Sequence, residues 1–193
     1  MKLPTLKIAN LDIKYPIVQG GMAIKASMSR LAAAVANEGG IGLIAGTALS
    51  IKELKDEIRK ARELTKGVIG VNIMFAAREF AELVMASIEE GIDLIVCGAG
   101  FSRDIFAIGK EHNTPIVPIV SSLKLAKISE KMGASAIIVE GGNAGGHLGT
   151  DLDSWDIVKE IKDNIKIPVI GAGGVITPED AKKMFSLGLD GIQ

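Results

Sequence analysis

The feature that most constrains the fold is a repeated alternation of short apolar runs with longer amphipathic stretches. The apolar runs begin at Ile17, Ile41, Val68, Asp93, Pro115, Ala136, Ile167 and Asp190. Their starts lie roughly 21–31 residues apart, about the length of one strand-helix unit. Because the runs are almost continuously apolar, we expect each strand to be buried on both faces, as in a parallel sheet.

Eight such runs in one series favour an α/β fold, an eight-stranded (β/α)8 TIM barrel, over an open sheet. Barrels of this type usually take about 250 residues. Here the eighth run is reached at Gln193, in a chain of 193 residues. We therefore expect a single domain over 1–193 that is truncated within or just after strand 8. A barrel that lacks the helix over its last strand would expose an apolar surface. That surface would make this fragment poorly stable or drive it to form a homo-oligomer.

Several stretches carry local structural signals. Ser50-Ile-Lys-Glu53 reads as a capping box, and Thr177-Pro178-Glu-Asp180 opens a helix that Gly188 is placed to end. His112 lies near a predicted helix end, where a cation is favoured. The opening segment 6–15 alternates weakly around Ala9-Asn10, so we predict a β-hairpin ahead of the first buried strand.

Composition excludes several function classes. The 22 basic and 23 acidic residues are dispersed and give a net charge of −1, so nucleic acid is not an expected partner. The single cysteine, Cys97, allows neither an intrachain disulfide nor a cysteine-rich metal site, and we expect it in the core. No apolar run reaches about 18 residues and the start lacks a signal-peptide core, so we expect a cytoplasmic protein without a membrane span.

The residues that follow the apolar runs are candidate site residues, because ligands of such barrels bind at the carboxyl ends of the strands. They are Gln19–Met22, Ala45–Thr47, Asn72, Cys97–Gly100, Ser121 and Ser122, the loop from Glu140, and Gly171–Gly174. Most are small, which leaves a wide floor suited to a large planar ligand. Ser121 and Ser122 are better explained as a helix cap.

The loop Glu140-Gly-Gly-Asn-Ala-Gly-Gly-His-Leu-Gly-Thr150 is the strongest candidate for an active-site wall. It is rich in glycine, which lets a flat ligand approach the backbone, and it contains His147. An imidazole titrates near neutral pH. Strand-to-helix connections usually take about 2–6 residues, and this one is longer.

These motifs carry a family resemblance. Gln19-Gly20-Gly21-Met22, Asn72 in Val-Asn-Ile-Met, the loop containing Ala144-Gly-Gly-His-Leu-Gly149, and Gly171-Ala-Gly-Gly-Val175 stand in order along the chain. Together they resemble the FMN-dependent nitronate monooxygenase family, formerly 2-nitropropane dioxygenase, which is related to the FMN-dependent enoyl-ACP reductases. The similarity covers essentially all 193 residues. The first and third motifs are specific, whereas Gly-Ala-Gly-Gly occurs in many phosphate-binding barrels.

The resemblance implies that FMN lies across the barrel mouth. It assigns ten cofactor-binding residues: Gly20, Gly21 and Met22 along the isoalloxazine, Asn72 and Glu140 as hydrogen-bond partners, Gly145 where the cofactor passes, Ala172, Gly173 and Gly174 at the phosphate, and Gln193 from the family's second phosphate loop. It makes His147 the catalytic base or the electrostatic partner of the substrate. It implies no metal.

The residues alone leave alternatives open. Asn72 either contacts a ligand or braces a loop, because a polar group in an apolar strand needs a partner. Glu140 either accepts from a flavin hydroxyl or forms an ion pair. Met22 either contacts the flavin or only packs, and His147 either acts on substrate or caps a turn.

Three functions are compatible with these motifs. The first is a nitronate monooxygenase, which oxidises nitronates or nitroalkanes with O2. The second is an enoyl-ACP or enoyl-thioester reductase that uses NAD(P)H. The third is an inactive barrel fragment that binds flavin or a phosphorylated metabolite. Asn143–Gly149 is nearer the monooxygenase form than the Glu-Ser-Gly-Gly-His-Ile-Gly of the reductases, and this favours the first.

Overall fold

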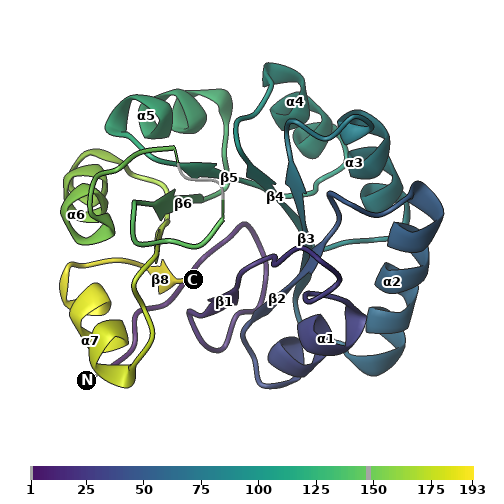
Figure 1. Cartoon of the computed structure of the whole chain (residues 1–193), viewed down its shortest axis with the longest axis horizontal. Helices are drawn as coiled ribbons and strands as arrows, with labels where there is room; N and C mark the ends of the chain where they lie inside the picture. The colour runs from purple at the N-terminus through teal and green to yellow at the C-terminus, as the bar shows by residue number, and fades with distance from the viewer. Residues whose placement is uncertain (1, 147–148) are drawn as a thin grey trace.

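In a computed structural model that describes residues 2–146 and 149–193, eight strands form one sheet in sequence order, and every neighbouring pair is parallel (Figure 1). The strands are β1 (Val18–Gln19), β2 (Ile41–Ala45), β3 (Ile69–Met74), β4 (Leu94–Gly98), β5 (Ile116–Val120), β6 (Ile137–Glu140), β7 (Val169–Ala172) and β8 (Gly191–Ile192). All eight predicted strands are therefore confirmed, as is their parallel arrangement.

Helices connect successive strands and form the outer layer (Figure 1). They are α1 (Ser29–Asn37), α2 (Ile51–Leu64), α3 (Phe80–Glu89), α4 (Arg103–Glu111), α5 (Leu123–Met132), α6 (Ser154–Asn164) and α7 (Pro178–Ser186). None of the helices in the described part of the chain is long and apolar enough to cross a membrane.

The two ends of the sheet meet and close the ring. Ile17, directly before β1, forms an isolated parallel bridge with Ile192 of β8. The amide of Ile192 donates to the carbonyl of Pro16 at 3.0 Å. This closure confirms the predicted TIM barrel, in which all eight strands point their carboxyl ends to one rim.

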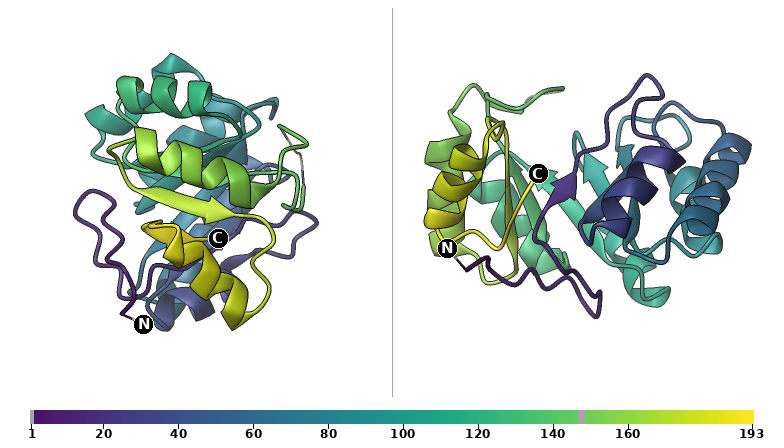
Figure 2. Two further views of the ribbon diagram at one scale, coloured as in Figure 1. Left: turned by 90° about the vertical axis from the view of Figure 1, so that its left-hand side faces the viewer. Right: turned by 90° about the horizontal axis from the view of Figure 1, so that it is seen from below.

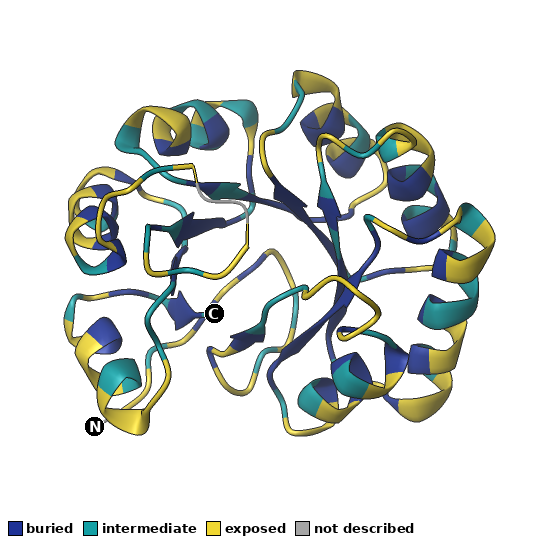
Figure 3. Ribbon diagram, in the orientation of Figure 1, coloured by how far each residue is buried: buried dark blue, intermediate teal, exposed yellow. Residues whose placement is uncertain are grey.

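Two apolar layers hold the barrel together, one inside the ring and one between the sheet and the helices (Figure 3). Alternation along β2 illustrates the division: Leu43 belongs to the interior cluster and Ile44 to the outer one, and both are fully buried. Burial on both faces explains why the strands read as continuous apolar runs.

The prediction of a β-hairpin over 6–15 is wrong. No strand forms in this stretch, although its turn at Ala9 does, with a left-handed φ of 50°. Leu6 and Ile8 instead enter the interior cluster. The segment before β1 crosses the end of the barrel opposite the strand-end loops (Figure 2). The weak alternation of apolar and polar residues arises because Leu6 and Ile8 are both buried. They pack against the barrel interior rather than against a partner strand.

The local helix signals are confirmed. Ser50 and Glu53 form a reciprocal capping box on α2, and Thr177 does the same with Asp180 on α7. His112 is the C-cap residue of α4. Cys97 is buried in the outer apolar layer, and burial raises the pKa of its thiol to about 12, so it is a core residue.

Close approach of α1 to the sheet depends on Gly42 in β2. A methyl group added at Gly42 would overlap the backbone carbonyl of Ala32 in α1. The alanine-rich face of α1, with Ala32, Ala33 and Ala36 buried, provides the matching small surface. Because backbone atoms cannot swing away as a side chain does, the position excludes any larger residue.

We predict that Gly42→Ala lowers the free energy of unfolding by roughly 1–3 kcal/mol, the usual cost of overpacking, as measured by urea denaturation. Gly145→Ala is the control, because a methyl group there meets no atom of the described residues within 4 Å. Both substitutions lower the conformational entropy of the unfolded chain by the same amount, so this effect cancels when the two variants are compared. Equal unfolding free energies for the two variants would contradict this account of the α1–β2 contact.

Candidate functional site

A cavity of about 980 Å³ opens at the carboxyl ends of the strands. Every strand contributes to its wall, either by its last residues or by the residue that follows it. The strand-end residues that line it include Gly20, Ala45, Asn72, Gly98, Ile119, Glu140, Ala172 and Gln193. Its volume lies at the upper end of the range for ligand sites, about 300–1,000 Å³.

The structure gathers all ten predicted cofactor-binding residues in the wall of this cavity. They are Gly20, Gly21, Met22, Asn72, Glu140, Gly145, Ala172, Gly173, Gly174 and Gln193. Their contact with a cofactor stays a prediction. His147, the predicted catalytic residue, lies outside the described residues.

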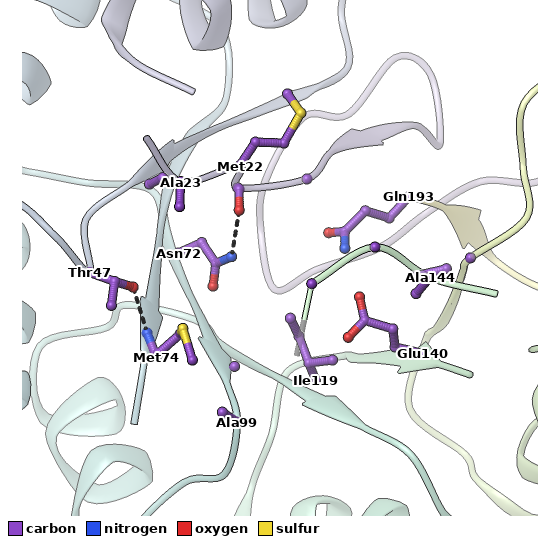
Figure 4. A pocket seen from close by; sticks show the side chains of 18 of the residues that line it. Met22, Ala23, Thr47, Asn72, Met74, Ala99, Ile119, Glu140, Ala144 and Gln193 are labelled. Carbon is purple, nitrogen blue, oxygen red and sulfur yellow. Dashed lines mark hydrogen bonds between the residues drawn. The ribbon is translucent and has the colours of Figure 1, made fainter. Parts of the chain in front are cut away.

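Asn72 on β3 lines the cavity and uses one half of its amide to brace the site. Its Nδ2 donates to the carbonyl of Gly21 at 3.4 Å (Figure 4). Its Oδ1 is buried and has no hydrogen-bond partner among the described residues. A buried amide oxygen left unpaired costs free energy, which a ligand donor would recover. Both predicted roles of Asn72, bracing and ligand contact, are therefore compatible with its geometry.

Two further acceptors face the same space. The Oε1 of Gln193 is buried and finds no partner in the described parts of the chain. Glu140, at the end of β6, is half-buried, and this burial raises the pKa of its carboxyl group. Figure 4 shows Asn72 on β3, Glu140 on β6 and Gln193, which follows β8, pointing toward one cavity. Such a floor suits a ligand that presents several N–H or O–H donors.

The turn after β7 supplies donors instead. Gly173 and Gly174 adopt left-handed angles, with φ of 96° and 73°, and their amides donate to no described group. The amides of Ile176 and Thr177 already donate to the carboxylate of Asp180, at 3.2 and 2.8 Å. An anion would therefore bind at the glycine amides, because Asp180 occupies the first turn of α7 and would repel it.

The long glycine loop after β6 is closed on itself before α6 begins. The side-chain amide of Asn143 donates to Asp153 at 3.0 Å and accepts from the amide of Ser154 at 2.9 Å. The hydroxyl of Ser154 accepts from the amide of Gly141 at 3.1 Å. A methyl group at Gly173 would overlap Ser154, so the loops after β6 and β7 are packed together.

The loop after β1 is held by two polar residues, Gln19 and Ser27. The hydroxyl of Ser27 is fully buried and contacts Gln19 Nε2, the amide of Met22 and the carbonyl of Gly20. Sequence reasoning missed Ser27, because only the folded loop brings to it the side chain of Gln19 and the two backbone groups that it contacts. Gln19, part of the specific first motif, points to this brace and is not among the cavity-lining residues.

Apolar side chains stand exposed around the cavity mouth. Ile24 is 96% exposed and Ile176 is 88% exposed, and both line the cavity from loops at opposite ends of the chain. Ile24 also has a left-handed φ of 59°, an outlier for a β-branched residue. Met22, half exposed, completes this apolar rim, defined as Met22, Ile24 and Ile176.

Acidic, histidine and cysteine side chains do not gather into a metal site in the part of the chain that the structure describes. No group of three or more such side chains there could hold a metal ion.

Known proteins share the sequence and the fold. Residues 4–193 match the family model described as nitronate monooxygenase. A Mycobacterium tuberculosis protein named (3aS,4S,5R,7aS)-5-hydroxy-7a-methyl-1-oxo-octahydro-1H-indene-4-carboxyl-CoA dehydrogenase is 33% identical over 177 residues, which cover 90% of this chain and 49% of that protein. A Staphylococcus aureus protein named probable nitronate monooxygenase is 31% identical over 228 residues, which cover 95% and 64%.

A solved structure of FabK from Thermotoga maritima is 36% identical, with a TM-score of 0.91 over 95% of this chain and 58% of that one. The chain thus spans about half the length of the Mycobacterium relative and less than two thirds of the other two. The family model covers nearly every residue, including the motifs that line the cavity, and this chain therefore belongs to the nitronate monooxygenase family.

Proposed function

We propose that this chain forms the flavin-binding barrel of an FMN-dependent oxidoreductase, and that its reaction is the oxidation of alkyl nitronates or nitroalkanes with O2. The observation that carries the flavin proposal is the set of acceptors on Asn72, Glu140 and Gln193 that face one cavity. Family membership and the name of the Staphylococcus aureus relative support the choice of reaction.

The residues present fit FMN part by part. The ring N–H and the ribityl hydroxyls of FMN are donors, which match unpaired oxygens such as Asn72 Oδ1 and Gln193 Oε1. The phosphate is an anion and matches the amides of Gly173 and Gly174, which donate to no group in the described residues. A methyl group added at Gly145 would meet no atom of the described residues within 4 Å, which leaves room there for a flat ring. When bound, FMN would take electrons from the nitronate and pass them to O2.

The protein would contribute orientation and proton transfer. Asn72 and Glu140 would fix the cofactor at the ends of β3 and β6. His147, proposed from its motif, would take the α-proton of a nitroalkane as a neutral imidazole, or pair with the nitronate anion as an imidazolium. Both roles need the imidazole close to the reactive edge of the flavin.

A reductase acting on acyl thioesters is the second candidate. The observation that favours it is the apolar rim, where Ile24 and Ile176 are almost fully exposed at the mouth. Such a rim suits a substrate with a substantial apolar part. The name of the Mycobacterium tuberculosis relative, a carboxyl-CoA dehydrogenase, supports the thioester substrate but not the direction of the reaction. NAD(P)H would then be the reductant.

Anaerobic absorption spectra of the FMN-loaded protein separate these candidates. We expect ethylnitronate to bleach the flavin without NADH. Bleaching by NADH and not by ethylnitronate would favour the reductase. A protein that retains no flavin would contradict both, and would favour a barrel that binds a phosphorylated metabolite.

We predict that His147→Ala lowers turnover of a nitroalkane by about 10²–10⁴-fold, the usual contribution of a general base, while FMN stays bound. Steady-state oxygen consumption measures turnover, and the flavin absorbance of the purified variant measures occupancy. His112→Ala is the control, because His112 is an exposed cap of α4 and does not line the cavity. Equal turnover of the two variants would remove His147 from the mechanism.

We predict a pH-dependent stability effect at Glu140 in the flavin-free protein. Burial raises the pKa of Glu140 above its ordinary value of 4.5. The carboxyl group therefore favours folding while protonated, and loses that contribution as the pH rises through the raised pKa. Glu140→Gln should raise the thermal midpoint near neutral pH, and the gain should vanish below the ordinary pKa.

Thermal unfolding of both proteins across this pH range tests the prediction. Glu160→Gln, at an exposed position on α6, is the control and should shift neither midpoint nor pH profile in this way. The same Glu140→Gln variant should weaken FMN binding, because an amide accepts less strongly than a carboxylate. Tighter FMN binding by the variant would contradict the proposed role of Glu140.

A further inference from the structure

The loop after β1 lacks the support that a sheet usually gives. β1 is two residues long, and its ladder with β2 ends at the pair Gln19 and Gly42. Gly20, Gly21 and Met22 line the cavity immediately beyond that pair. Their backbone must be fixed by something other than strand pairing.

A buried side-chain brace takes over where the ladder stops. Gln19 Oε1 accepts from the amide of Leu43 on β2 at 3.1 Å. Gln19 Nε2 donates to Ser27 Oγ at 2.9 Å and also to the carbonyl of Gly20. The side chain of Gln19 thus continues the hydrogen bonding of β1 to β2 past the last ladder pair.

Ser27 is the centre of the brace. Its hydroxyl donates to the carbonyl of Gly20 at 3.2 Å and accepts from the amide of Met22 and from Gln19 Nε2, both at 2.9 Å. A hydroxyl has one donor and two acceptor sites, so its capacity is filled. The backbone of Ser27 also closes the loop, with its amide donating to Met22 at 3.1 Å and its carbonyl accepting from Ala45 at 2.9 Å.

The loop that Ser27 closes is strained. Ile24 and Lys25 both have left-handed backbone angles, with φ of 59° and 58°. Residues other than glycine adopt this region at an energetic cost, and the cost persists only where surrounding contacts fix the conformation. The hydrogen bonds of Ser27 tie both ends of this turn to β1 and β2. An internal bond from the amide of Ala26 to the carbonyl of Ala23 and an exposed ion pair between Lys25 and Glu53, both at 3.2 Å, add to them.

The position of this loop in turn determines the orientation of the side-chain amide of Asn72. The carbonyl of Gly21 accepts from Asn72 Nδ2 at 3.4 Å, and this contact selects the amide orientation in which Oδ1 is buried without a partner among the described residues. A methyl group at Gly21 would lie 2.5 Å from the Cβ of Asn72, so the two residues leave no room for independent movement. A displaced loop would remove the partner that selects the orientation of Asn72.

We propose that Ser27, with Gln19, is a positioning residue for flavin binding: it holds Gly20–Met22 at the cavity wall and, through Gly21, keeps the acceptor of Asn72 directed at the ligand. This inference rests on the proposed flavin function. Ser27 itself does not line the cavity and acts only through the loop.

Ser27→Ala tests the proposal against Ser87→Ala. Ser87 is the matched control, because it is also fully buried and its hydroxyl donates to the carbonyl of Leu83 at 2.8 Å within α3, away from the cavity. In the flavin-free protein we expect Ser27→Ala to speed amide exchange of Met22 and tryptic cleavage after the exposed Lys25 by at least about 10-fold, with Ser87→Ala unchanged. Unchanged exchange and cleavage in Ser27→Ala would overturn the brace.

FMN titration, followed by quenching of flavin fluorescence, provides the second measurement. We expect Ser27→Ala to weaken FMN binding by about 10-fold, and its effect to be non-additive with that of Asn72→Ala, because both act on one contact. A loosened loop with unchanged FMN affinity, or fully additive effects, would make Ser27 merely structural and overturn the positioning role. Should Ser27→Ala fail to fold, Gln19→Met removes the other half of the brace and serves the same test.

The two proposals fail in distinguishable ways. A parent protein that binds no FMN refutes the proposed function, and the positioning role with it, whatever the loop does. A parent protein that binds FMN while Ser27→Ala binds it equally well refutes the positioning role alone.

Discussion

Closure of the sheet is the constraint on which the rest of the structure depends. Ile17 and Ile192 join the first and last strands, and the interior is then sealed at one end by Leu6 and Ile8. A closed parallel ring buries both faces of every strand and leaves only one open end, the carboxyl rim. Any polar group that the strands deliver at their ends must therefore be paired there or be offered to a ligand.

Hydrogen-bond acceptors and hydrogen-bond donors occupy different parts of the carboxyl rim. Acceptors that have no partner among the described residues belong to Asn72 on β3 and to Gln193 after β8, and the half-buried carboxyl of Glu140 lines the same cavity. Free amide donors stand on the turn after β7, at Gly173 and Gly174. An asymmetric ligand with donors at one end and an anion at the other would satisfy both sets, and this is the physical reason that we propose FMN rather than a simple phosphorylated metabolite.

Much of the architecture was predictable, because its signals are local. The apolar runs specify the strands, and capping residues such as Ser50 and Thr177 specify where helices begin. Since parallel strands of one barrel end at one rim, the residues after each run could be predicted to gather, and the ten proposed cofactor residues do line one cavity. Their chemical roles came from the family resemblance, and no ligand contact is needed to explain their positions.

What could not be predicted depends on contacts between distant segments. Leu6 and Ile8 alternate as a strand would, but the open end of the barrel offers them a better apolar partner than a hairpin does. Ser27 carries no sequence signal, because its role depends on three hydrogen-bond partners. These come together only when the loop returns past β1. The left-handed angle of Ile24 is likewise a property of the closed loop and contradicts the usual preference of a β-branched residue.

The most direct test of the central claim is an experimental structure of this protein with FMN bound. The account predicts that flavin donors lie within hydrogen-bonding distance of Asn72 Oδ1 and Gln193 Oε1, and that the phosphate contacts the amides of Gly173 and Gly174. A flavin bound elsewhere, or one that leaves both amide oxygens unpaired at the barrel floor, would contradict it.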